Sequence, residues 1–167
     1  MNDKSSEVDI FRDTPVRFLG YANEVGEAFR SLVSKSIVHG SYVVAFGYVF
    51  MDVIDKARKT IKIETENKQT SPYTKAAKVG ADCLVWQTFA SVLIPGFTIN
   101  RICFTSLLFL NKVNKSNLRF NKMLTTAIGL GSIPVIIHPI DHFCHQAMDL
   151  TLRPILGIEP HIKKTSV

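Results

Sequence analysis

Three long stretches that are almost free of charge dominate the pattern of polar and apolar positions along the chain. They cover residues 37–54, 84–110 and 123–140. A helix of about 20 apolar residues crosses the roughly 30 Å hydrocarbon core of a bilayer. The helices of a soluble bundle would show a charged stripe at every third or fourth residue, and these stretches lack one. The pattern therefore predicts about three transmembrane helices.

A different pattern precedes the first stretch. Thr14 is a suitable N-cap and Pro15 suits the first helical position. Apolar side chains then follow at spacings of three and four residues: Phe18, Ala22, Val25, Phe29 and Leu32. Opposite them lie two acids and two bases: Arg17, Glu24, Glu27 and Arg30. We expect an amphipathic helix over 14–36. Because its polar face is balanced in charge, packing of its apolar stripe on the bundle is favoured over a position in the membrane interface.

The segments between and after the apolar stretches are polar. Residues 55–78 are rich in lysine and arginine and contain Ser71-Pro72, so they are interpreted as a basic, flexible connector. A second basic connector covers 111–122, and 141–167 forms a C-terminal tail. Basic residues are divided almost equally between the two faces of a three-span arrangement, which leaves the orientation open. The fold class is all-α: a small multi-pass helical membrane bundle.

Composition agrees with a single membrane domain over residues 1–167. The chain is 46% hydrophobic and 20% charged, with a formal net charge of +6. An excess of basic residues can serve nucleic acid, acidic partners or anionic lipid. Here the bases flank apolar stretches, so the lipid bilayer is the expected partner and nucleic acid is not. The acidic N-terminus does not match a cleavable presequence or a secretory signal, and any membrane address is expected to be internal.

Polar residues inside the apolar stretches are the candidate functional positions. Pro95-Gly96 should kink the second stretch, because proline removes a backbone hydrogen bond and glycine permits a close helix approach. Arg101 follows, and an arginine at mid-membrane costs about 2.5–3.5 kcal/mol. We favour a span that ends near Asn100, with 102–110 along the interface, over one long tilted helix.

Two aspartates belong to the same group of candidates. In the alternative with one long helix, Arg101 would pair with Asp52 or Asp82 inside the bundle. Asp52 is otherwise interpreted as a helix-end residue near headgroup water, with Asp55 three residues further on.

The remaining candidates lie after the third stretch. Asp141, His145 and Asp149 share one helix face, but no diagnostic metal signature accompanies them, so no metal is expected. Pro139-Ile140-Asp141 resembles the opening of the mitochondrial carrier signature. That motif requires a basic residue where this chain has Cys144, and it should recur three times, so the carrier interpretation fails.

Signatures of catalysis are missing from the sequence. It contains no P-loop, no G-x-G-x-x-G and no G-x-S-x-G. The three cysteines are far apart and suit neither a disulfide framework nor a zinc site. We expect no enzymatic activity, no cofactor and no small-molecule substrate.

Four sequence blocks carry a resemblance to a known family. They are RFLGYANEVGEAFRSLV (Arg17–Val33), DVIDK (Asp52–Lys56), VWQTFASVLIPGFTINRIC (Val85–Cys103) and TTAIGLGSIPVIIHPID (Thr125–Asp141). In these blocks the chain resembles the mitochondrial fission process proteins, which are small multi-pass proteins of the inner mitochondrial membrane.

The resemblance implies a role in mitochondrial division and inner-membrane organisation, without known enzymatic activity. It also implies partners among other inner-membrane proteins or the fission machinery. The alternative from the residues alone is a transporter or channel component, because polar side chains lie in or beside apolar helices: Asp52, Gln87, Asn100, Arg101 and His138.

Overall fold

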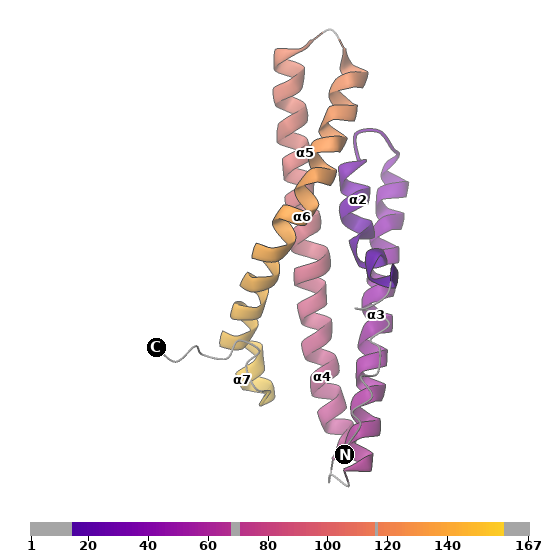
Figure 1. Ribbon diagram of the computed structural model, residues 1–167, viewed down its shortest axis with the longest axis vertical. Helices are drawn as coiled ribbons and strands as arrows, with labels where there is room; N and C mark the ends of the chain where they lie inside the picture. Colours follow the sequence, from indigo (N-terminus) through magenta and orange to yellow (C-terminus); the bar gives the residue numbers. More distant parts are fainter. Residues whose placement is uncertain (1–14, 68–70, 116, 159–167) are drawn as a thin grey trace, which may run out of the picture.

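The computed structural model describes residues 15–67, 71–115 and 117–158. Its elements, in chain order, are η1 (Pro15–Tyr21), α2 (Ala22–Ala28), α3 (Lys35–Glu66), α4 (Pro72–Gln87), η2 (Thr88–Leu93), α5 (Ile94–Val113), α6 (Leu118–Leu150) and α7 (Leu152–Leu156). Within these residues every regular element is helical, which confirms the all-α fold (Figure 1). Thr14, the expected N-cap, and residues 159–167 of the expected tail lie outside the described residues.

Three helices in the described part of the chain are long and apolar enough to cross a membrane: Lys35–Glu66, Pro72–Val113 and Leu118–Leu150. Each contains one of the three predicted apolar stretches. All three extend well beyond those stretches, so the predicted connectors are much shorter than expected.

The described residues of the segment 55–78 are mostly helical, where a flexible connector was expected. α3 continues through it to Glu66 and α4 begins at Pro72. Lysines, glutamates and isoleucines on α3 sustain the helix, and ion pairs support it: the Lys59 ammonium lies 2.7 Å from the Asp55 carboxylate and the Lys75 ammonium 2.6 Å from the Glu64 carboxylate. The second pair joins α3 to α4.

The second apolar stretch is one continuous helix through its proline. η2, immediately before Pro95, is a π-helix. Proline has no N–H, and its ring crowds the carbonyl four residues earlier, so a wider turn at this point accommodates it. α5 continues through Arg101 to Val113, so residues 102–110 belong to the same helix as the residues before Asn100.

The third stretch also continues past its predicted end. α6 includes both Pro134 and Pro139 and extends to Leu150, so the first ten residues of the expected tail are helical. The short helix α7 follows and ends at Gly157, whose φ of 66° is left-handed. Such a backbone conformation favours glycine after a helix.

The N-terminal helical region is shorter than predicted, and it faces the other way. η1 and α2 end at Ala28, and α3 begins only after a turn. The predicted polar face is the buried one, with Glu24 0% and Glu27 2% exposed. Phe18 of the predicted apolar stripe is 65% exposed. The expectation that this stripe packs on the bundle is therefore wrong.

The same inversion occurs along the long helices. Val43 is 72%, Phe109 67% and Val135 71% exposed, whereas Asp52, Gln87 and Asn121 are buried. In water this arrangement would leave extensive apolar patches exposed and bury polar groups at a cost. In lipid it is favourable, because the surroundings are as apolar as the outward side chains. The distribution of side chains thus fits a bundle that lies in a bilayer.

Small residues allow the helices to approach closely. A Cβ at Gly129 on α6 would lie 3.2 Å from the Ala28 Cα and 2.6 Å from the Cys103 Sγ. α2 therefore packs against α6 and α5, and Figure 1 also shows it alongside the first half of α3. The C-terminal half of α6 crosses away from α4 toward α7.

Candidate functional site

The inward face of α2 carries a buried carboxylate with several donors. The Glu27 carboxylate accepts hydrogen bonds from Arg30 Nε (2.6 Å), Arg30 Nη2 (2.5 Å), Tyr42 Oη (2.9 Å) and Asn100 Nδ2 (2.8 Å). These donors come from the turn after α2, from α3 and from α5. We call Glu27, Arg30, Tyr42 and Asn100 the Glu27 cluster. It joins three elements through one side chain.

Electrostatics keep this carboxylate ionised. Burial raises the pKa of Glu27, but hydrogen bonds from Arg30, Asn100 and Tyr42 outweigh burial and lower it below its ordinary value. The pKa of Arg30 is raised by its bonds to Glu27 against the opposing effect of burial. A charge-assisted cluster of this kind stabilises a helix contact, and it leaves the carboxylate with no role as a proton donor.

Pro95-Gly96 lies next to the Glu27 cluster. A Cβ at Gly96 would lie 2.6 Å from the Tyr42 Oη and 3.0 Å from the Asn23 Nδ2. The Asn23 amide donates a 3.0 Å hydrogen bond to the Val92 carbonyl oxygen in η2. The π-helix and the glycine together let α2 and α3 place polar groups against the second span.

Glu24 lies about one turn before Glu27 and has a contrasting environment. Its side chain is fully buried, and neither carboxyl oxygen has a hydrogen-bond partner among the described residues. Burial, with a smaller contribution from Asp141, raises the pKa of Glu24 to about 8. This setting favours the protonated form of the carboxyl over the carboxylate.

A second polar cluster lies between α3 and α4. The Asp52 Oδ2 lies 2.6 Å from the Lys56 Nζ and also accepts hydrogen bonds from Gln87 Nε2 and, at 3.6 Å, from Cys83 Sγ. Asp52 is 1% exposed and lies within α3. The interpretation of Asp52 as a helix-end residue in headgroup water is therefore wrong.

Arg101 does not pair with either aspartate. It is exposed, donates to the Asn100 Oδ1 (3.0 Å), and its guanidinium carbon lies 5.3 Å and 5.6 Å from the ring centroids of Phe97 and Phe104. Lys56 and Arg153 are the cations at Asp52 and Asp82. Two aromatic rings beside an outward arginine suit a side chain that reaches toward headgroups.

A third cluster surrounds Arg153, near the end of the described chain. The guanidinium donates to Asp82 (2.9 and 3.3 Å) and to Asp149 (2.6 Å), and it lies 3.3 Å from the His145 Nδ1. His145 also stacks on Trp86 with ring centroids 4.9 Å apart. Asp149 and His145, two of the three residues considered for a metal, thus contact an arginine. The other candidates of that segment, Pro139 and Asp141, lie in α6.

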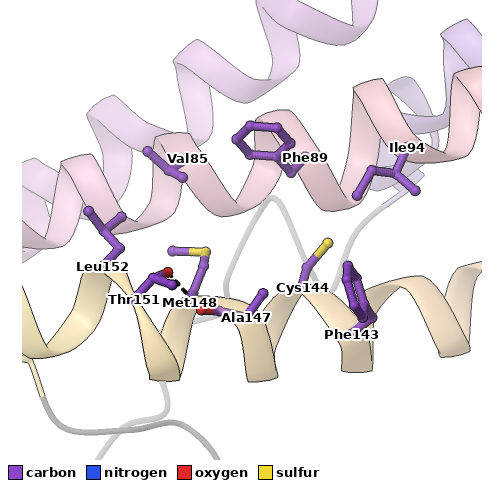
Figure 2. Close-up of a pocket in the computed structure, with 9 residues that line it drawn as sticks. All are labelled: Val85, Phe89, Ile94, Phe143, Cys144, Ala147, Met148, Thr151 and Leu152. Atoms are coloured by element: carbon purple, nitrogen blue, oxygen red, sulfur yellow. Dashed lines mark hydrogen bonds between the residues drawn. The ribbon is translucent and has the colours of Figure 1, made fainter.

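An apolar groove of about 270 Å³ lies between the second span and the end of α6. Figure 2 shows its lining side chains, which are Val85, Phe89, Ile94, Phe143, Cys144, Ala147, Met148, Thr151 and Leu152. This lining offers shape and apolar surface but hardly any polar group that could perform chemistry.

The structure distributes the polar candidates over separate places. Asp52 and Gln87 meet in one cluster and Asn100 belongs to another, while Arg101 lies on the outside. Sequence reasoning did not single out Glu24, Glu27, Asn23 or Arg153. Glu24 and Glu27 belong to the polar face of the amphipathic pattern. A polar face is expected to be exposed, so the pattern gave no reason to consider them as buried residues.

Comparisons with known proteins agree with the resemblance in the sequence. A family model described as Mitochondrial 18 kDa protein (MTP18) matches residues 9–148. The Mitochondrial fission process protein 1 of Caenorhabditis elegans is 56% identical over 154 residues, which are 92% of each chain. The Homo sapiens protein of the same name is 49% identical over 152 residues, 91% of this chain and 90% of its own.

A more distant relative is a viral protein. An uncharacterized protein of Acanthamoeba polyphaga mimivirus is 28% identical over 147 residues, which are 88% of this chain and 79% of its own. No solved structure matches the chain.

Proposed function

This chain belongs to the Mitochondrial 18 kDa protein family, and we propose that it promotes mitochondrial fission and inner-membrane organisation as a non-enzymatic, multi-pass protein of the inner mitochondrial membrane. The fission role in this proposal is supported by the names of its relatives. Three helices with outward apolar side chains support a place in a membrane. Alkaline extraction and protease treatment of intact and outer-membrane-stripped mitochondria test the location.

The non-enzymatic part of the proposal rests on how the polar residues are used. Glu27, Asp52 and Arg153 each bind side chains of other helices. Groups engaged in this way stabilise helix contacts and are not positioned around a reacting atom. The protein then acts through its surface, toward lipid and toward other inner-membrane proteins or the fission machinery.

The outward stripe of the N-terminal region is the proposed contact surface. Phe18, Val25 and Leu32 are exposed, and the Glu27 cluster fixes the orientation of α2 from behind. α2 lies alongside only the first half of α3 (Figure 1), so this exposed stripe is confined to one part of the bundle. Apolar ridges with fixed orientation suit helix docking in membranes.

The test is depletion followed by rescue. Depletion should lengthen the mitochondrial network, and the wild-type chain should restore it. A chain with Phe18→Ala, Val25→Ala and Leu32→Ala should insert but fail to restore it. The matched control carries Val43→Ala, Phe50→Ala and Ile54→Ala on the exposed side of α3, and it should restore the network. An unchanged network after depletion would contradict the fission role, and equal rescue by both variants would contradict the surface.

A further inference from the structure

Glu24 is a buried acid without a counterion among the side chains that the structure describes. Its side chain is 0% exposed, and both carboxyl oxygens lack a partner among the described residues. An ionised carboxylate in such a place carries a large desolvation cost, and the usual solution is to bind a proton.

The surroundings of Glu24 repel negative charge. Its titratable neighbours are Asp141 on α6 and Tyr42 on α3, which both interact with it electrostatically, and Glu27 about one turn along α2. On the α5 side, the neutral amide of Asn100 binds Glu27. Among the described side chains, the base on the same segment is Arg30, and it is already engaged by Glu27. A negative charge on Glu24 would therefore face two other acids.

A metal ion is a poor alternative occupant. Within residues 15–67, 71–115 and 117–158, no group of three or more His, Cys, Asp or Glu side chains could hold a metal. A proton needs only one carboxyl oxygen, which is what the site offers.

We propose that Glu24 is a proton-binding site: its carboxyl holds a proton while α2 is seated on the spans, and release of that proton loosens α2 from α6. In the release step the O–H bond of the acid breaks, the proton passes to water, and the electron pair stays on the carboxylate. The new charge repels Asp141 and draws water to the α2–α6 contact. This site is independent of the proposed fission role.

Infrared difference spectroscopy of the full chain in lipid nanodiscs tests proton binding directly. A protonated carboxyl has its own carbonyl stretch, and that band should be lost as the pH is raised past about 8. It should be missing at every pH in Glu24→Gln and unchanged in Glu27→Gln, the matched control. A band that persists in Glu24→Gln, or a wild-type chain without the band at neutral pH, would overturn the proposal.

A second variant keeps the test valid if Glu24→Gln does not fold. Asp141→Asn removes one source of repulsion, so the midpoint of the Glu24 band should move to lower pH. An unmoved or raised midpoint would contradict the role of Asp141 in the site.

Movement of α2 is measured at Cys103, a buried thiol that packs with Ala28 of α2. Labelling with a membrane-permeant maleimide, read by mass spectrometry, should accelerate at Cys103 across the titration by several-fold more in the wild type than in Glu24→Gln. Cys83 and Cys144 control for the general effect of pH on thiols. Equal acceleration at Cys103 in both proteins would refute the coupling to α2.

Discussion

Two buried ionic clusters lie at different levels of the same bundle, and their charges are reversed. In the Glu27 cluster a carboxylate is the buried centre, and its cation, Arg30, is 37% exposed at the edge. In the Arg153 cluster a guanidinium is the centre, and the carboxylates of Asp82 and Asp149 surround it. Asn100 and Asp82 belong to one continuous helix, so the clusters are about 27 Å apart along its axis.

The comparison shows that each cluster holds a different set of helices together. The Glu27 cluster joins α2, α3 and α5, while the Arg153 cluster joins α4, the end of α6 and α7. Apolar burial gives little drive for helix association in lipid, so polar contacts and close packing carry more of it. We therefore expect the packing of each set of helices to depend on the charged side chain at the centre of its cluster, Glu27 or Arg153.

The largest effect is expected for Arg153→Leu. Removal of a buried cation leaves Asp82 and Asp149 uncompensated, which costs about 3–5 kcal/mol of folding free energy. Unfolding by denaturant in mild detergent measures the loss. Asp55→Asn, at a pair near the surface of α3, is the control and should cost at most about 1 kcal/mol. Similar losses in both variants would contradict the special cost of removing the buried charge of Arg153.

Glu27→Gln should have a smaller effect, because the orphaned Arg30 can turn to solvent. We expect a loss of about 1.5–3 kcal/mol, the range for hydrogen bonds to charged groups. The same unfolding assay measures it, and a loss as large as that of Arg153→Leu would show that exposure of the cation does not matter.

The pH dependence separates Glu27 from Glu24. The lowered pKa of Glu27 contributes stability above the ordinary value of 4.5, and this is lost as the pH falls through its folded pKa. The raised pKa of Glu24 has the opposite sign, since its contribution is lost as the pH rises from 4.5 toward about 8. Thermal melting across pH should show the loss between pH 4.5 and about 8 flattened in Glu24→Gln, and the loss at lower pH flattened in Glu27→Gln. Matching profiles in the two variants would contradict this assignment.

Gly96→Ala examines how tightly the Glu27 cluster is packed. The new methyl group would crowd the Tyr42 hydroxyl and the Asn23 amide, and overpacking of this kind costs about 1–3 kcal/mol. Gly131→Ala is the matched control on α6, because no atom lies within 4 Å of its added Cβ. An unchanged melting temperature in Gly96→Ala would show that the side chains around Gly96 can move to accommodate a methyl group.

The smallest effect is expected for Arg101→Leu. This arginine is exposed, and its interactions within the described part of the chain are with Asn100, Phe97 and Phe104. The folding free energy should change by less than about 0.5 kcal/mol. A clear loss of stability would mean that Arg101 joins the Glu27 cluster through Asn100.

The three spans could be predicted from the sequence because charge-free stretches of sufficient length have few other uses. The orientation of the N-terminal helix could not. Periodicity shows that Phe18 and Glu24 lie on opposite faces, but the inward face depends on whether water or lipid surrounds the bundle. An inward apolar stripe is what water favours, whereas the outward stripe of the structure fits lipid.

The contact partners of the polar residues could not be predicted from the sequence either. Asp52 and Gln87 lie far apart in sequence, as do Asp82 and Arg153, and a single sequence holds no record of such contacts. The predicted end of the first helix at residue 54 was wrong for a local reason. Lysine and glutamate between 55 and 66 suggest solvent, and they are also good helix formers, so exposure to water was mistaken for loss of structure.

The length of α3 has a mechanical consequence. Its 32 residues make a rod of about 48 Å, and the hydrocarbon core is about 30 Å thick. The helix is therefore roughly 18 Å longer than the hydrocarbon core is thick, and the Lys75–Glu64 pair joins its second half to α4. α3 is a single unbroken helix over this whole length. We therefore expect a displacement at the Glu66 end of α3 to be transmitted along the helix to the buried contacts of Asp52.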